Sequence, residues 1–409
     1  MPTLTLRFLG AALFAGLAIC GCAAHSVTGQ ETLPPLGPRS AGSAPIKHVI
    51  IVIQENRSFD DLFATFPNAA GATSGQAEPM PKSLAATCAY DKMPVITQSN
   101  TTVPLTKVSL VGNGFPGDFA AGTDLPHTYV PGFLLDYDGG AMDGFDLEGK
   151  GPNGSGQPAC TYPYQYVNPK EITEYWDLAT QYVLADQTFQ TQGSGSFTAH
   201  QDLIAGATAV NYKTKKYGKN SVIDNPTGSQ VWGCDSPPGA VTTLITTQLK
   251  LLSNDGPFPC FAYKTMRDLL DAKSVSWKYY AQAVGQPAGI WSAFDAISAV
   301  RHGAEWGKKV VSPDTLIFDD IKKGKLPAVV WISPDAQNSD HPDEVFHKKL
   351  VDDGPSWVAS IVNAVGNSKY WNSSAIVILW DDWGGFYDHE SPAFLRDDQG
   401  GLGFRVPML

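Results

Sequence analysis

The chain has 409 residues, of which 43% are hydrophobic and 11% aromatic, and its formal net charge is -11 at pH 7. This length and composition suit a globular protein with one large α/β domain or two smaller ones. The acidic balance argues against general nucleic-acid binding, because no excess of basic residues offsets the phosphate charge. Small phosphate esters are not excluded as ligands, since a bound cation reverses the local field.

The first segment is a predicted export signal. Arg7 precedes an apolar run over 8–19 that is too short to span a bilayer. A small residue just before Cys22 resembles a bacterial lipoprotein signal, with Cys22 carrying the lipid that attaches the protein to a membrane. Cleavage after Ala24 is the rival interpretation. Both predict an exported protein, in the periplasm, in the cell envelope or secreted, with a signal over 1–24 and a Gly/Pro/Ser/Thr-rich flexible tether over 25–45.

The four cysteines after the signal are Cys88, Cys160, Cys234 and Cys260. An even number in an exported chain indicates two disulfides, for which three pairings exist. We favour Cys88–Cys160 with Cys234–Cys260, on sequence neighbourhood alone. The spacing does not match that of a zinc–thiolate site.

The first predicted strand covers 47–53 and contains five consecutive apolar β-branched residues. Such a run is typical of a strand buried on both faces of a parallel sheet. It stops at Gln54-Glu55-Asn56-Arg57-Ser58. Because α/β folds place ligand sites at the carboxyl edge of the sheet, this carboxylate, amide, guanidinium and hydroxyl predict a site for a metal ion and an anion together.

The later elements alternate between helices and strands. Helices are predicted over 58–66, from Pro169 onward, over 198–207 and from Gly354 to Gly366. Strands are predicted over 275–280, 327–332 and 375–380, and loop-rich stretches over 68–165 and 210–262. This alternation indicates a mainly parallel α/β sandwich with long loop insertions over the active face. The chain ends at Arg405-Val406-Pro407-Met408-Leu409, which is typical of the start of a strand, so we expect the domain over 46–409 to be truncated at its C-terminus.

Acids follow two of the predicted strands: Glu55 after the first, and Asp381-Asp382 after the strand over 375–380. If both strands are central, three carboxylates converge and repel one another. One divalent cation removes that repulsion, and hard cations prefer oxygen ligands. A single acid at such a position is more often a helix cap, but the two strand ends together favour a metal site.

Residues in loops supply further candidates. Ser196 lies in a Gly/Ser turn before a predicted helix, where a serine can attack phosphorus, although such a serine is commonly a cap. His127 and His341 lie in turn-like segments, where imidazoles bind phosphate or protonate a leaving oxygen, although lone loop histidines are commonly solvated. His389 follows the Asp381-Asp382 pair, either as support for the site or in a surface turn. The other histidines, including His200, are assigned structural or solvent-facing positions.

Taken in order, these motifs resemble the bacterial phosphoesterase family of non-haemolytic-type phospholipases C and acid phosphatases, within the alkaline-phosphatase-like fold. The stretches that carry the resemblance are 46–60, 140–145, 325–329, 339–342 and 381–389. The resemblance covers most of the chain from Ile46 onward. It implies a three-layer sandwich around a mainly parallel sheet, and it supports truncation because relatives continue past residue 407.

The resemblance also implies roles for individual residues. The implied ligands of one divalent metal ion are Glu55, Asn56, Asp381 and Asp382. Ser196 is the implied nucleophile, aligned on Leu203-Ile204-Ala205-Gly206, with Ser194 and Thr198 as rivals. His127 and His341 are the implied phosphate-binding and proton-transfer groups, and we assign Arg57 and His389 to substrate binding.

From these features we expect an exported, metal-dependent phosphoric-ester hydrolase that acts through a phosphoserine intermediate. Its substrate is expected to be a phospholipid or a phosphomonoester. The alternative is a surface-anchored binding protein that keeps the fold but lacks turnover.

Overall fold

The computed structural model describes residues 45–110, 124–149, 159–211, 213, 218–228, 231–342, 353–393 and 401–409. All of them belong to the structural unit formed by residues 31–409. The predicted signal over 1–24, with Cys22, and the tether up to residue 44 lie outside the described residues. Within the described ranges, none of the helices has the length and apolar character that a membrane crossing requires.

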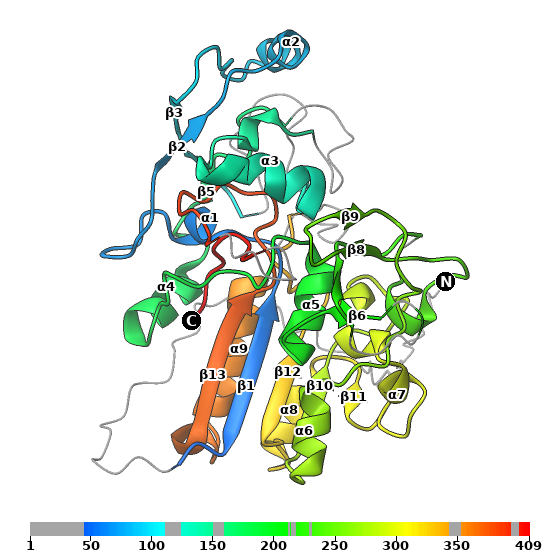
Figure 1. Ribbon diagram of the computed structural model, residues 1–409. Helices are drawn as coiled ribbons and strands as arrows, with labels where there is room; N and C mark the ends of the chain where they lie inside the picture. The colour runs from blue at the N-terminus through cyan, green and yellow to red at the C-terminus, as the bar shows by residue number, and fades with distance from the viewer. Residues whose placement is uncertain are drawn as a thin grey trace, which may run out of the picture. The chain divides into compact units, whose positions relative to one another are not determined.

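The centre of the fold is a five-stranded sheet in which every neighbouring pair is parallel (Figure 1). Its strand order is β11-β10-β12-β1-β13. The strands are β1 (His48–Gln54), β10 (Trp277–Tyr280), β11 (Val310–Val311), β12 (Val329–Ile332) and β13 (Ser374–Trp380). The prediction of an α/β fold with a mainly parallel central sheet is confirmed, and β1 lies between two strands from the last third of the chain.

Helices pack on both faces of this sheet because its strands are apolar on both sides. Alternate residues of β1 point to opposite faces, so Ile50 and Val52 join one core and Ile51 and Ile53 the other. The first core includes side chains of α4 (Thr173–Gln181), α8 (Leu316–Lys322) and α9 (Gly354–Gly366). The second includes side chains of α5 (Ser196–Ala205), α6 (Met266–Ala272) and α7 (Ser298–Arg301).

The loop-rich stretches contain short elements outside the central sheet. The first stretch and its flanks hold α1 (Phe59–Phe63), β2 (Ser74–Ala77), α2 (Lys82–Tyr90), β3 (Thr101–Pro104), β4 (Thr106–Val108), α3 (Leu134–Tyr137) and β5 (Gln165–Val167). The second holds an antiparallel sheet of β6 (Ala209–Val210), β7 (Asn220–Ile223), β8 (Thr243–Ile245) and β9 (Leu251–Leu252). The helix predicted to start at Pro169 instead begins at Thr173, because Asn168 forms a turn by accepting from the Lys170 and Glu171 amides.

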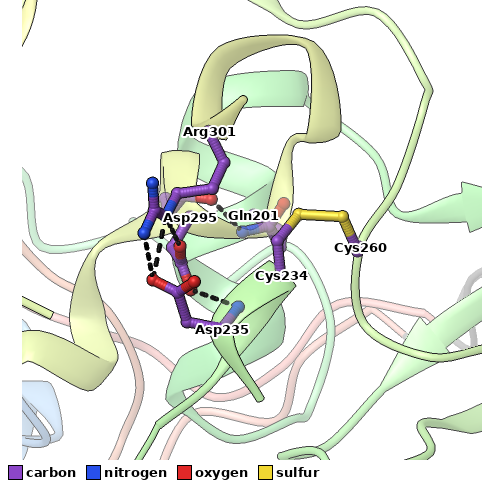
Figure 2. Close-up of a disulfide and its surroundings, with 7 residues drawn as sticks. Gln201, Cys234, Asp235, Cys260, Asp295 and Arg301 are labelled. Atoms are coloured by element: carbon purple, nitrogen blue, oxygen red, sulfur yellow. Dashed lines mark hydrogen bonds and ion pairs between the residues drawn. A yellow bond between two sulfur atoms is a disulfide. The ribbon is translucent and has the colours of Figure 1, made fainter. Parts of the chain in front are cut away.

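Both predicted disulfides are present, Cys88–Cys160 and Cys234–Cys260. Figure 2 shows the second one beside a group of ion pairs. Arg301 lies 2.7 Å from Asp235 and 3.0 Å from Asp295. The disulfide joins the turn around residue 234 to Cys260, and the Asp235–Arg301 pair joins the same turn to α7.

The last residues pack against the start of the fold. Arg405 and Met408 form isolated antiparallel bridges, with Phe189 and Leu379 respectively, rather than a strand of the central sheet. The Arg405 guanidinium is fully buried and binds Asp388 through two contacts, of 2.8 and 3.0 Å. It also lies 3.3 Å from Asp60, so it supplies the positive charge for two buried carboxylates.

Arg405→Met is expected to lower the free energy of unfolding by about 3–5 kcal/mol, because it leaves buried carboxylates without a cation. Urea unfolding at pH 7 measures this. Lys323→Met, which removes an exposed pair with Asp319, is the matched control and should have a much smaller effect. Equal effects of the two substitutions would contradict the role given to Arg405.

Candidate active site

The candidate site is built on the carboxyl ends of β1 and β13. Gln54 pairs in register with Trp380, so Glu55 and Asp381 leave adjacent strands at the same level. The backbone N–H of Asn56 donates to Asp381 Oδ1 at 3.0 Å, and this hydrogen bond links the two strand ends. The acids predicted to converge from distant parts of the chain therefore do so.

Helix α5 brings Ser196 to these strand ends. Ser196 Oγ lies 3.0 Å from Asp382 Oδ2 and 3.3 Å from Asn56 Oδ1. The other oxygen of Asp382 accepts from the Gly384 amide at 2.8 Å. Gly384 has φ +65°, and a Cβ there would meet the Asn56 carbonyl oxygen at 2.3 Å, so the close approach requires glycine.

His200 completes the cluster. Its Nε2 lies 2.7 Å from Glu55 Oε1 and 3.7 Å from Asp381 Oδ2. The sequence interpretation gave this histidine a structural or solvent-facing position and so missed it. His200 could have been recognised as a site residue from its position four residues after Ser196, which places both side chains on the same side of α5.

The electrostatics of this cluster are unfavourable without a cation. Burial, followed by the neighbouring charge of Asp381, raises the pKa of both Glu55 and Asp382 well above the usual range. Burial lowers the pKa of His200 to about 4, so its imidazole is neutral at pH 7. Among the described residues, Glu55 Oε2 and Asp381 Oδ2 have no hydrogen-bond donor.

These residues also have the donor atoms for a metal ion. Glu55, His200 and Asp381 each offer one atom, and the three atoms lie within 4.8 Å of one another. Carboxylate oxygens are the ligands that hard divalent cations prefer, and the His200 Nε2 in this group lies 2.7 Å from Glu55 Oε1. The residues present therefore fit the predicted metal.

His127 and His341 lie beside each other, with ring centroids 6.2 Å apart. His127 Nδ1 donates to the Leu125 carbonyl oxygen at 2.8 Å, which leaves Nε2 for another partner. Burial lowers the pKa of His127, but the carboxylates of Asp382 and Asp124 outweigh it, so the net shift is upward. The structure thus places His127 within electrostatic reach of the cluster, with His341 beside it.

The two alternative nucleophiles, Ser194 and Thr198, are hydrogen-bonded to the Asp224 backbone. Ser194 Oγ accepts from the Asp224 amide at 2.8 Å, and Thr198 Oγ1 donates to the Asp224 carbonyl oxygen at 3.3 Å. Of these three hydroxyls, only that of Ser196 is hydrogen-bonded to Asp382. The geometry supports Ser196 as the nucleophile.

The structure does not bring Arg57 to the cluster. Its guanidinium is buried and donates to the Asp340 carbonyl oxygen, to Asp61 and to the Leu110 carbonyl oxygen, at 2.8, 3.1 and 3.0 Å. The predicted substrate contact is not supported, because these donors are satisfied by the protein. Arg57 instead fixes the turn that leads into His341.

His389 is also placed away from the cluster. Its Nδ1 lies 2.6 Å from Asp60 Oδ2, in the network organised by Arg405. Its predicted contact with substrate is therefore not supported by this geometry. The hydrogen bond to Asp60 gives His389 a structural partner.

Comparison with known proteins identifies the family to which the chain belongs. Residues 46–409 match the Phosphoesterase family. The chain is 25% identical over 371 residues to Phospholipase C A of Mycobacterium tuberculosis, covering 87% of this chain and 61% of that protein. It is 26% identical to Phospholipase C B of the same organism, over 87% of this chain and 62% of that protein. It is 23% identical to a non-hemolytic phospholipase C of Pseudomonas aeruginosa, over 88% of this chain and 44% of that protein.

The chain thus spans less than two thirds of the length of these curated relatives. The family match itself extends from residue 46 to residue 409 and includes both strand ends and Ser196. The chain belongs to the Phosphoesterase family.

Proposed function

We propose that this chain is a metal-dependent phosphoric-ester hydrolase that acts through a phosphoserine intermediate on Ser196. The observation that carries the proposal is the position of Ser196 Oγ, 3.0 Å from Asp382 and beside a buried group of acids. Family membership supports ester hydrolysis, and the relatives are named as phospholipases C. The parallel sheet with helices on both faces supports an alkaline-phosphatase-like fold.

Glu55, Asn56, Asp381 and Asp382 would hold one divalent ion. The unpaired oxygens of Glu55 and Asp381 support this assignment. When bound, the ion would neutralise the carboxylates and lower the pKa of the Ser196 hydroxyl. His200 would fix the orientation of the Glu55 carboxylate, because its neutral imidazole can donate Nε2–H to Glu55 Oε1.

Ser196 Oγ would attack phosphorus in line with the leaving alcohol. The bond from Oγ to phosphorus forms as the ester bond breaks, and the hydroxyl proton leaves along the hydrogen bond to Asp382 Oδ2. His127 would donate a proton to the leaving oxygen, since the Asp124 carboxylate, 3.5 Å from its Nδ1, favours the imidazolium. Water then releases the phosphoryl group and restores the serine.

The substrate class is a phospholipid or a phosphomonoester, and we place the protein outside the cytoplasm. The relatives' names support the phospholipid. The two disulfides support an oxidising compartment, in agreement with the predicted signal.

Ser196→Ala is expected to lower turnover of p-nitrophenyl phosphate by on the order of 10³-fold or more, because it removes the nucleophile. Elemental analysis should show that this variant keeps its metal, whereas Asp381→Asn should lose metal because it removes a ligand charge. Ser194→Ala and Thr198→Ala should each retain measurable turnover. An active Ser196→Ala with an inactive Ser194→Ala or Thr198→Ala would move the nucleophile. A folded, metal-free wild type without turnover would favour the binding-protein alternative.

We expect kcat/KM to fall at alkaline pH with the pKa of His127, because this histidine must be protonated to act as the general acid. Asp124 lies 3.5 Å from His127 Nδ1 and raises its pKa, so Asp124→Asn should lower that pKa. Activity should then fall at a lower pH than in the wild type. A fall in activity at an unchanged pH would assign the proton donor to another group, such as His341.

Parallel assays should separate the two substrate classes. The names of the relatives lead us to expect diacylglycerol release from phosphatidylcholine vesicles at a higher kcat/KM than phosphate release from p-nitrophenyl phosphate. Ser196→Ala is the control in both assays, since both reactions share the nucleophile. Phosphate release without diacylglycerol release would make the chain a phosphomonoesterase.

A further inference from the structure

The helix that carries Ser196 lacks a side-chain cap of its own. Its N-cap residue is Gly195, which has no side chain to accept from the first free amides. Asn225 supplies the missing acceptor from a different part of the chain, two residues after the end of β7. Asn225 Oδ1 accepts from the Phe197 amide at 2.9 Å.

Asp224 holds the same turn through its backbone. Its amide donates to Ser194 Oγ at 2.8 Å, and its carbonyl oxygen accepts from Thr198 Oγ1 at 3.3 Å. Together with the Asn225 contact, these bonds engage residues on both sides of Ser196 in the sequence. Asp224 itself has φ +64°, a conformation that persists in a non-glycine residue when its surroundings fix it.

The same pair also holds the segment that follows His127. Asp224 Oδ1 accepts from the Tyr129 amide at 2.6 Å. A Cβ on Gly195 would lie 3.2 Å from Asn225 Oδ1 and 3.3 Å from the His127 carbonyl oxygen. The nucleophile turn, Asn225 and the His127 backbone are therefore packed against one another.

We propose that Asp224 and Asn225 are positioning residues for phosphoryl transfer, which hold the Ser196 turn and the His127 segment in one fixed arrangement. The proposal rests on the proposed function. In-line attack requires the nucleophile, the phosphorus and the proton donor to be aligned, and a displacement of about 1 Å costs on the order of a hundredfold in rate. Neither residue needs to touch the substrate to have this effect.

The test compares three substitutions in the full, metal-loaded chain with p-nitrophenyl phosphate. Asn225→Ala removes the acceptor and should lower kcat by roughly ten- to a hundredfold while KM changes by less than about threefold. Asn225→Asp keeps an acceptor oxygen at a helix N-terminus and should keep kcat within about threefold of the wild type. Asn220→Ala, at the start of β7, is the matched control and should leave both constants unchanged.

Amide hydrogen exchange supplies a readout that does not depend on turnover. The Phe197 amide should lose protection in Asn225→Ala and keep it in Asn225→Asp, while the Tyr129 amide stays protected in both because its partner is Asp224. Unchanged kcat in Asn225→Ala, equal losses in the two Asn225 variants, or unchanged Phe197 protection would each overturn the proposal. An inactive wild type would refute the proposed function, and the exchange result would still decide whether Asn225 holds the turn.

Discussion

The parallel pairing of β1 with β13 is the constraint on which the site depends. The pairing joins residues more than 300 positions apart, and its register places Gln54 opposite Trp380. Glu55 and Asp381 follow directly, so their convergence is a consequence of strand register. A slip of one residue would send every side chain of β1 to the opposite face of the sheet and would move Glu55 out of line with Asp381.

Two clusters of buried acids differ in how their charge is balanced. Around Asp60 and Asp388, the buried Arg405 supplies the positive charge. Around Glu55, Asp381 and Asp382, no Lys or Arg within the described ranges forms an ion pair. The histidine beside them is neutral at pH 7 because burial lowers its pKa. This contrast is the physical reason for proposing a bound cation at one cluster and none at the other.

Much of the framework could be predicted from local pattern. The runs that form β1, β12 and β13 are apolar on both faces, which indicated buried parallel strands, and the acids after β1 and β13 followed from the same reading. The disulfides were paired correctly on neighbourhood alone.

What the sequence could not supply was the partner of each polar side chain. From its place after the first strand, Arg57 was predicted to bind substrate. In the folded protein its guanidinium instead donates hydrogen bonds to protein oxygens. Asn225 lies in a stretch predicted as loop. Its contact with Phe197 depends on the packing of β7 and β8 against α5, which brings the end of β7 to the start of that helix. His200 was recoverable from its spacing to Ser196, but its burial against Glu55 was not.

The most direct test of the central claim is anomalous diffraction from crystals grown with Mn²⁺. The account predicts one strong peak at about 2.0–2.6 Å from carboxylate oxygens of both Glu55 and Asp381, with the Ser196 hydroxyl alongside. A peak at Asp124, His127 and His341, or at Asp60, Asp388 and His389, with none between the two strand ends, would contradict it.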